Sequence, residues 1–147
     1  MTLDELKKKG FIEVEDDISF RTHADVLRLF GKDQKLIQRA FVQHPHEIGV
    51  RIWFPVFYDD SNNDWINTFG LNEDLVFEKR KFDNQDYLEE LSQRPEWHLR
   101  VLFAKLDRSG RINYKFKGLY NFDLERSRTA NKAVYVRIEK KAKLYLV

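Results

Sequence analysis

Alternating apolar and polar residues in the segment 111–123 form the clearest pattern in this chain of 147 residues. Strict alternation predicts a half-buried strand, because successive side chains of a strand point to opposite faces. The residues expected on one face are Tyr114, Phe116, Gly118 and Tyr120. Lys115 and Lys117 are expected on the other face, and residues 107–110 have the composition of a hairpin turn that leads into the strand.

Similar apolar patterns predict further strands at 50–58, 75–79, 97–106, 133–138 and 143–147. Pro55 marks an edge or a bulge within the first of these, because proline cannot donate a hydrogen bond to a neighbouring strand. The residues between 59 and 64 are Asp, Ser and Asn, a composition typical of a turn. We therefore expect strands that are joined mostly by hairpin-like links.

Helix-capping residues predict short helices among these strands. Thr2 and Glu5 have the spacing of a capping box, and Gly10 is placed to end that helix. Thr22 is placed to begin a second helix that ends at Gly31, and 85–92 has the pattern of a third. Apolar spacing also favours a helix at 35–42. The expected fold class is α+β, with two or three short helices and a curved, largely antiparallel sheet that can close into a barrel.

The length and composition are those of one globular domain that spans residues 1–147. The absence of cysteine excludes disulfides, thiol catalysis and thiolate metal sites. No apolar run is long enough to cross a membrane, and the charged N-terminus lacks the apolar core of a signal peptide. A cytoplasmic protein with no membrane partner is the simplest expectation.

Positive charge is concentrated toward the C-terminus, although the net charge is only +2. Residues 107–147 contain 11 Lys or Arg and 4 Asp or Glu, so the remaining 106 residues carry a net negative charge. A basic surface attracts phosphate groups, which favours nucleic acid as a partner. A solvated sheet face whose lysines maintain solubility is the alternative.

Candidate catalytic groups lack the spacing that catalysis needs. His44 and His46 are two residues apart, but no motif supplies the third ligand of a zinc site, so a polar loop is the expectation there. The serines lack a glycine-flanked turn, and the glycines form no phosphate-binding loop. We therefore expect no catalytic residues, no metal site and no cofactor.

A metal-dependent nuclease remains an alternative, because two carboxylates and a lysine can hold a divalent cation beside an attacking water. The residues that would form such a site are Asp59, Asp60, Glu78, Lys79 and Lys81.

An aromatic and acidic segment between two predicted strands is the best candidate for a binding pocket. A flipped base needs flat side chains for stacking and polar groups for its Watson–Crick edge, and a carboxylate accepts from the cytosine amine. The candidate residues are Tyr58, Asp59, Asp60, Asp64, Trp65, Asn67 and Phe69. The alternative is a turn whose Asp and Asn residues hold the backbone while Trp65 and Phe69 enter the core.

The chain resembles SRA (SET- and RING-associated) domains, which are DNA readers of the PUA-like superfamily. The resemblance lies in the segment 114–120, Tyr-Lys-Phe-Lys-Gly-Leu-Tyr, and in the segment 133–138, Ala-Val-Tyr-Val-Arg-Ile. Lys117 stands where the family motif has Asp. The order of an aromatic–acidic segment, a helix and a strand containing Leu99 and Val101 is also similar. The resemblance implies a PUA/SRA-like fold that binds a modified cytosine, flipped into the aromatic pocket.

The expected function is therefore a DNA-binding module that recognises a modified cytosine within a restriction or defence system. DNA is a more natural partner than RNA, and a nuclease would be supplied as a partner protein or a fused domain. The residues expected to contact phosphates are Arg108, Arg111, Lys115 and Lys117. A protein-interaction or inhibitor domain, for example of phage origin, is a further alternative, in which exposed aromatic residues bind a protein.

Overall fold

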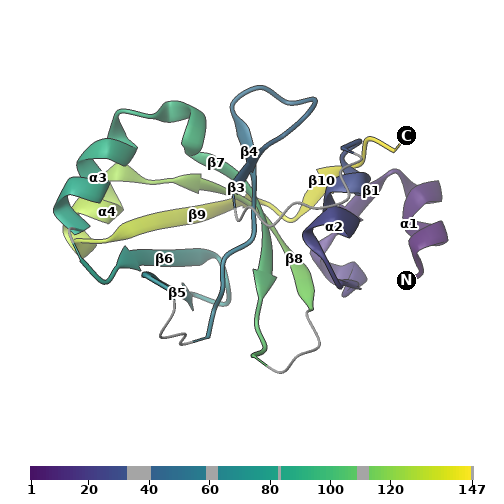
Figure 1. Cartoon of the computed structure of the whole chain (residues 1–147), viewed down its shortest axis with the longest axis horizontal. Helices are drawn as coiled ribbons and strands as arrows, with labels where there is room; N and C mark the ends of the chain where they lie inside the picture. The colour runs from purple at the N-terminus through teal and green to yellow at the C-terminus, as the bar shows by residue number, and fades with distance from the viewer. Residues whose placement is uncertain (33–40, 59–62, 83, 109–112, 147) are drawn as a thin grey trace.

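A computed structural model describes residues 1–32, 41–58, 63–82, 84–108 and 113–146 of the chain. Within these residues a sheet of eight strands runs through the molecule, in the order β3-β4-β7-β8-β9-β6-β5, and β2 pairs with β8 (Figure 1). The strands are β2 (Ser19–Phe20), β3 (Phe41–Gln43), β4 (Val50–Trp53), β5 (Trp65–Gly70), β6 (Leu75–Arg80), β7 (Leu99–Lys105), β8 (Tyr114–Phe122) and β9 (Ala133–Glu139).

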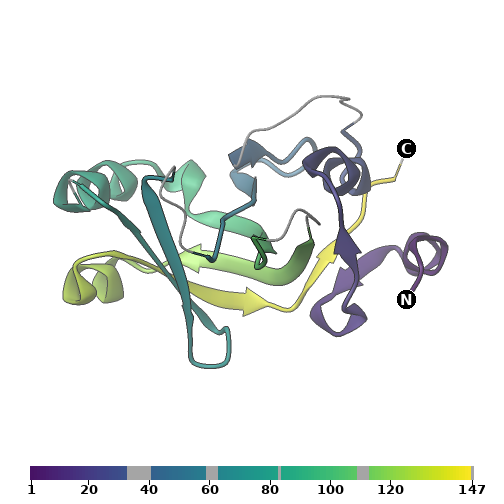
Figure 2. The ribbon, with the colours of Figure 1, turned by 60° about the horizontal axis from the view of Figure 1, so that its bottom comes forward.

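Most neighbouring strands of this sheet are antiparallel, while β4 and β7 run parallel. The sheet curves strongly when seen from the side (Figure 2). In the described part of the chain, β3 and β5 stand at opposite ends of the strand order and do not pair with each other. The predicted α+β class and the curved, largely antiparallel sheet are therefore confirmed, and the sheet is not closed into a barrel.

Helices gather at the two ends of the molecule. α1 (Leu3–Lys9) and α2 (His23–Leu29) lie at one end, next to a two-stranded sheet of β1 (Phe11–Glu13) and β10 (Lys141–Lys143) (Figure 1). The other end carries α3 (Asn84–Ser92) and α4 (Leu124–Ala130) (Figure 1). Two short 3-10 helices, η1 (Val14–Asp16) and η2 (Pro95–Trp97), complete the described elements.

The helix starts that were predicted from capping residues are confirmed. The Thr2 hydroxyl accepts a hydrogen bond from the Glu5 amide at 3.1 Å, and Gly10 ends α1 in a left-handed conformation. At α2 the Thr22 hydroxyl accepts from the Asp25 amide at 3.1 Å. These side chains satisfy amide groups that have no partner within the helix itself.

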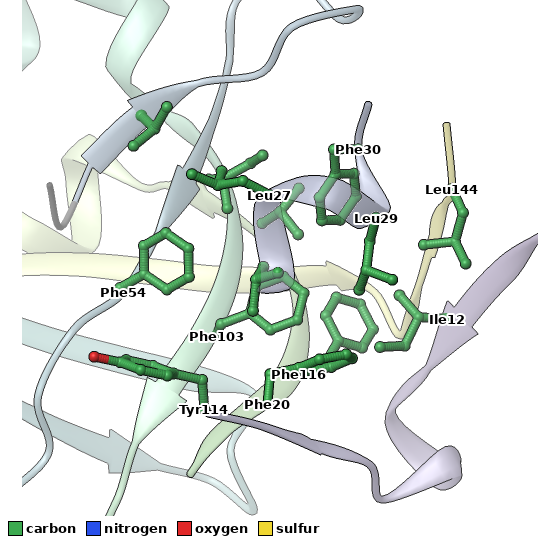
Figure 3. Packing of buried hydrophobic residues seen from close by; sticks show 14 of the residues in the cluster. Ile12, Phe20, Leu27, Leu29, Phe30, Phe54, Phe103, Tyr114, Phe116 and Leu144 are labelled. Atoms are coloured by element: carbon green, nitrogen blue, oxygen red, sulfur yellow. The ribbon is translucent and has the colours of Figure 1, made fainter. Parts of the chain in front are cut away.

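The sheet separates two hydrophobic cores, because alternate residues of its central strands enter different clusters. On β7, Val101 and Phe103 pack in the first core, whereas Leu102 and Ala104 pack in the second. Figure 3 shows the first core, where side chains of α2 and the C-terminal segment meet those of the sheet. The second core lies under α3 and holds the candidate site described below.

The prediction that four residues of β8 share one face is wrong beyond Gly118. Tyr114 and Phe116 pack in the first core, but Tyr120 packs in the second. The register of β8 against β7 shifts by one residue at Gly118, which is a β-bulge, and an extra residue reverses the alternation of side chains. Gly118 has φ 124, a conformation that glycine adopts much more readily than other residues.

Several segments differ from the elements that were predicted. Residues 65–70 form β5, although no strand was expected there, and the strand expected at 143–147 is instead β10, which ends at Lys143. Residues 124–130 form α4, although no helix was expected there; the Asp123 side chain caps its start by accepting from the Arg126 amide at 3.0 Å. The helix expected at 35–42 lies mostly outside the described residues, and Phe41 and Val42 belong to β3. Among the described helices, none is long and apolar enough to cross a membrane.

Candidate functional site

A cavity of about 290 Å³ opens beside the second core, between β3, β4, β5, α3 and η2. Its size is near the lower end of the roughly 300–1,000 Å³ that is typical of small-molecule sites, which suits one flat ring better than a large ligand. The lining residues are Phe41, Trp53, Phe54, Pro55, Val56, Asn63, Trp65, Asn67, Glu78, Tyr87, Trp97 and Arg100.

A larger groove, of about 700 Å³, lies on the other side of the molecule between α1, β2 and α2. Among the described residues, Phe20 is the one aromatic residue in its lining, and none of their buried polar side chains reaches it. The smaller cavity combines aromatic walls with buried polar groups, so it is the better candidate for a specific site.

Aromatic rings form the walls of this cavity. Trp65, the first residue of β5, meets the Tyr87 ring of α3 edge to face, with centroids 4.7 Å apart. Across the cavity, the rings of Phe41 and Trp97 are also arranged edge to face at 5.9 Å. Such walls offer flat surfaces on which a planar ligand can stack.

Arg100 occupies the floor of the cavity and is only 3 % exposed. Its guanidinium carbon lies 4.3 Å from the centre of the Phe41 ring, 4.6 Å from Trp53 and 4.5 Å from Tyr135. Its Nε donates to the Trp97 carbonyl oxygen at 2.7 Å. Three rings and a backbone acceptor therefore hold this cation in one orientation.

Glu78, on β6, is the buried carboxylate beside Arg100. Its Oε1 lies 3.8 Å from a guanidinium nitrogen of Arg100. The same oxygen accepts a hydrogen bond of 2.6 Å from the Tyr87 hydroxyl. The Tyr87 hydroxyl in turn lies 3.3 Å from the Tyr135 hydroxyl. Burial raises the pKa of the Glu78 carboxyl, while Arg100 and the tyrosine hydroxyls oppose that rise. Burial also raises the pKa of both tyrosines, so they act as neutral hydrogen-bond donors.

Asn67 supplies an acceptor that has no partner among the described residues. Its amide nitrogen donates to the Val56 carbonyl oxygen at 3.2 Å, but its Oδ1 is buried without a hydrogen bond among the described residues. Leaving a buried acceptor unpaired costs about 1–3 kcal/mol, which a ligand with a donor group would recover. Because β5 alternates, Trp65 and Asn67 lie on the same face of the strand.

The structure brings Trp65 and Asn67 of the predicted pocket together and places the other described members elsewhere. Phe69 shares their face of β5 but stacks on the Phe57 ring, with centroids 4.0 Å apart. Asp64 is exposed. Tyr58 lies outside the cavity lining, and the guanidinium carbon of Arg108 lies 5.5 Å from the centre of its ring. Asp59 and Asp60 lie outside the described residues.

The residues that were predicted to contact phosphates have different environments in the structure. Lys115 pairs with Asp17 at 2.9 Å, and Lys117 pairs with Glu73 at 3.1 Å while its side chain is only 14 % exposed. Arg108 is exposed on the chain that follows β7. Arg111 lies outside the described residues.

Sequence reasoning missed Arg100, Tyr87 and Trp97 as pocket residues and considered Glu78 only as part of a nuclease site. A signal was present for Arg100, since it interrupts an apolar run within a strand, and a charge inside such a run is rarely buried without a partner. Lys79 is exposed on the other face of β6. Nothing in the sequence indicated that β6 and β7 would bring the two charges together.

His44 and His46 lie together beside Tyr145, whereas His98 lies in another part of the fold. His44 is buried, and its Nδ1 accepts from the amides of His46 and Glu47 at 3.0 and 3.1 Å, which stabilises the loop between β3 and β4. His98 lies 2.6 Å from the Leu91 carbonyl oxygen. In the described part of the chain, no group of three or more His, Asp or Glu residues is arranged to hold a metal ion.

Comparison with known proteins identifies the fold. The family model of the SET and RING associated (SRA) domain matches residues 5–144. A solved structure of the 5-hydroxymethylcytosine-specific restriction enzyme AbaSI is similar over 97 % of this chain, with 31 % sequence identity and a TM-score of 0.81. The match covers 45 % of the AbaSI chain, so this protein spans less than half the length of that enzyme.

No curated protein matches the chain significantly. The family match extends over nearly all of the sequence, well beyond the two C-terminal segments that carried the resemblance. The chain therefore belongs to the SRA domain family.

Proposed function

We propose that this protein is a DNA-binding module that recognises a modified cytosine by flipping it into the cavity between Trp65 and Arg100. The observation that carries the proposal is the combination, in one small cavity, of aromatic walls with a buried carboxylate and an amide oxygen that no described residue pairs with. A flipped base is read by these means, with rings that stack on its faces and polar groups that meet its edge.

The proposal gives each polar group a partner on the base. Glu78, when ionised, accepts from the exocyclic amine of cytosine, the usual role of a carboxylate opposite this base. Asn67 Oδ1 accepts from the hydroxyl of a 5-hydroxymethyl group, which would satisfy its missing hydrogen bond. Similarity to AbaSI, a 5-hydroxymethylcytosine-specific enzyme, supports this modification over 5-methylcytosine, which carries no donor at that position.

The backbone of the DNA would be held by cations outside the cavity. Arg108 is exposed beside Tyr58 and suits a phosphate contact. Lys115 and Lys117 can take the same role only by sharing their present carboxylate partners, Asp17 and Glu73. Arg111 completes the proposed set, and binding through these residues would weaken as salt increases.

The proposed module acts within a restriction or defence system on cytoplasmic DNA. AbaSI, which this chain matches over less than half of its length, is a restriction enzyme, so cleavage would be supplied by another part of a longer protein or by a partner nuclease. In this arrangement residues 1–147 form one reading unit, and the pocket determines which sites are cut.

Competition binding tests the proposal with three duplexes of one sequence that carry cytosine, 5-methylcytosine or 5-hydroxymethylcytosine at one position. We expect the 5-hydroxymethylcytosine duplex to bind at least tenfold more tightly than the cytosine duplex. Trp65→Ala should reduce binding of the modified duplex about tenfold or more, because loss of one stacked ring costs about 1–3 kcal/mol. Asn67→Ala should remove most of the preference for the hydroxymethyl group over the methyl group.

Ile66→Ala is the matched control, because Ile66 is exposed on the opposite face of β5. Its affinity for each duplex should equal that of the wild-type protein. Equal binding of the wild-type protein to all three duplexes would contradict the proposed function.

A further inference from the structure

Arg51 is a half-buried cation whose hydrogen bonding is incomplete. It lies on β4 two residues from Trp53, so both side chains face the second core and the cavity. Its Nε is buried and has no hydrogen-bond partner among the described residues. Its guanidinium carbon lies 5.3 Å from the centre of the Phe41 ring, which forms part of the cavity wall.

A second arginine lies directly beside it. β4 and β7 run parallel, and Arg51 is in register with Arg100. Both guanidinium groups approach the Phe41 ring, Arg100 at 4.3 Å and Arg51 at 5.3 Å. Arg100 is buried at the floor of the cavity, whereas Arg51 is half-buried and stands nearer to solvent.

Among the described residues, the charges around the cavity do not balance. Glu78 is the one carboxylate that they contribute to the cavity lining, and it lies 3.8 Å from Arg100. Arg51 therefore adds a second positive charge next to a pair that is already neutral as a whole. No ion pair of Arg51 is found among the described residues, and a partly buried charge without a counter-charge is unfavourable, so the field of two arginines attracts an anion to this position.

The flipped nucleotide would bring a suitable anion. A base inside the cavity leaves its sugar and phosphates outside it, and Arg51 adjoins the cavity through the Phe41 ring of its wall. A guanidinium presents several donors in one plane and matches two oxygens of a phosphate at once. Arg51 is not itself a lining residue, but the Phe41 ring that it approaches is part of the lining, whereas Tyr58, beside Arg108, is not.

We propose that Arg51 binds the phosphodiester adjacent to the flipped nucleotide and so positions the base over Glu78 and Asn67. This inference rests on the proposed function and adds a residue that none of the sequence patterns indicated. Arg51 acts as a positioning residue: it contacts the backbone of the one nucleotide that has left the helix, rather than the base itself.

The test couples a change in the protein to a change in the DNA. Two duplexes carry 5-hydroxymethylcytosine, and in one of them the two phosphates that flank this nucleotide are replaced by neutral methylphosphonates. Fluorescence anisotropy gives the affinity of the wild-type protein, Arg51→Met and Arg51→Lys for each duplex. A charge-assisted hydrogen bond contributes about 1.5–3 kcal/mol, which corresponds to about a ten- to hundredfold change in affinity.

We expect the wild-type protein to lose about ten- to hundredfold in affinity when the two phosphates are neutralised. Arg51→Met should lose a similar factor on the natural backbone, with little further loss on the methylphosphonate duplex. The affinity of Arg51→Lys for the natural duplex should lie between those of the wild-type protein and Arg51→Met, because lysine keeps the charge without the planar fork. The affinity of Arg51→Met for DNA should also fall less steeply with salt, by the amount expected for about one phosphate contact fewer.

Arg128→Met is the matched control, since Arg128 is exposed on α4, away from the cavity. It should respond to methylphosphonates as the wild-type protein does, and thermal unfolding of every variant verifies folding. If Arg51→Met loses the same factor as the wild-type protein on the methylphosphonate duplex, the role of Arg51 is refuted while the pocket stands. If the wild-type protein does not prefer 5-hydroxymethylcytosine over cytosine, the proposed function fails and this inference fails with it.

Discussion

Single residues determine the chemistry of the cavity through buried polar groups that the fold leaves only partly satisfied. Asn67 Oδ1 has no partner among the described residues, and Glu78 is shared between Tyr87 and Arg100. Such groups destabilise the free protein, because buried polar atoms lose their hydration. In a binding site the same atoms provide specificity, since a ligand with matching donors restores the lost hydrogen bonds.

The buried carboxylate makes a prediction about pH and stability. Burial raises the pKa of Glu78 above the value of about 4.5 expected in an unfolded chain, so the folded protein binds this proton more tightly. The stability that results is present below pH 4.5 and is lost as the pH rises through the folded pKa. Glu78→Gln removes this loss, so its free energy of unfolding relative to wild type should increase from pH 4 to pH 8.

Urea unfolding at several pH values measures this difference, and the Tyr87 hydroxyl can still donate to the glutamine side chain. Glu89→Gln is the control, because Glu89 is exposed on α3 and its replacement removes one negative charge without changing a buried carboxylate. A relative stability of Glu78→Gln that falls with rising pH would show that the buried carboxylate is stabilised in its charged form.

At the scale of elements, β8 and its bulge connect the two cores. A Cβ atom at Gly118 would lie 2.6 Å from the Glu139 carbonyl oxygen and 2.7 Å from the Arg137 side chain. Contacts this short with backbone require the strands to move apart. β8 therefore needs glycine here both for its φ of 124 and for the close approach of β9.

We predict that Gly118→Ala destabilises the protein by about 2–4 kcal/mol, since it combines backbone strain with a steric clash. Gly49→Ala is a matched comparison, because Gly49 has φ 79 but nothing within 4 Å of the added Cβ atom. It should cost only the roughly 1–2 kcal/mol of the left-handed conformation. Urea unfolding checks both, and equal costs for the two substitutions would contradict the close approach.

The sequence predicted strands and capped helices well where one local pattern governs one element. Thr2 and Thr22 begin helices as expected, and the predicted strands at 75–79 and 133–138 form as β6 and β9. The prediction from sequence failed where tertiary contacts determine which way a side chain points. The bulge at Gly118 reverses the alternation of β8, and nothing local indicates that Tyr120 enters a different core from Phe116.

The pocket could be predicted only in part for the same reason. Trp65 and Asn67 stand in a segment that is rich in aromatic and polar residues, and the base-stacking interpretation selected them. Glu78 and Arg100 come from strands that are separated by β8 and β9 in the sheet. Their contact depends on the curvature of the whole sheet, which a local pattern does not contain.

The whole molecule is a curved sheet with a separate core on each face, and the candidate site belongs to one of them. The first core, under α2, is largely apolar and provides a rigid support. The second core, under α3, contains Arg100, Glu78 and the cavity. This arrangement separates stability from recognition, so substitutions in the cavity can alter binding while the first core keeps the sheet intact.

The central claim is that the modified base leaves the helix and enters the cavity, and a fluorescent base beside it tests this most directly. 2-Aminopurine is placed next to 5-hydroxymethylcytosine in a duplex, where stacking quenches its fluorescence. Saturating protein should increase this fluorescence severalfold, with a smaller increase for Trp65→Ala and none for a duplex that contains plain cytosine. Saturated binding to the modified duplex without any increase in fluorescence would contradict base flipping into this cavity.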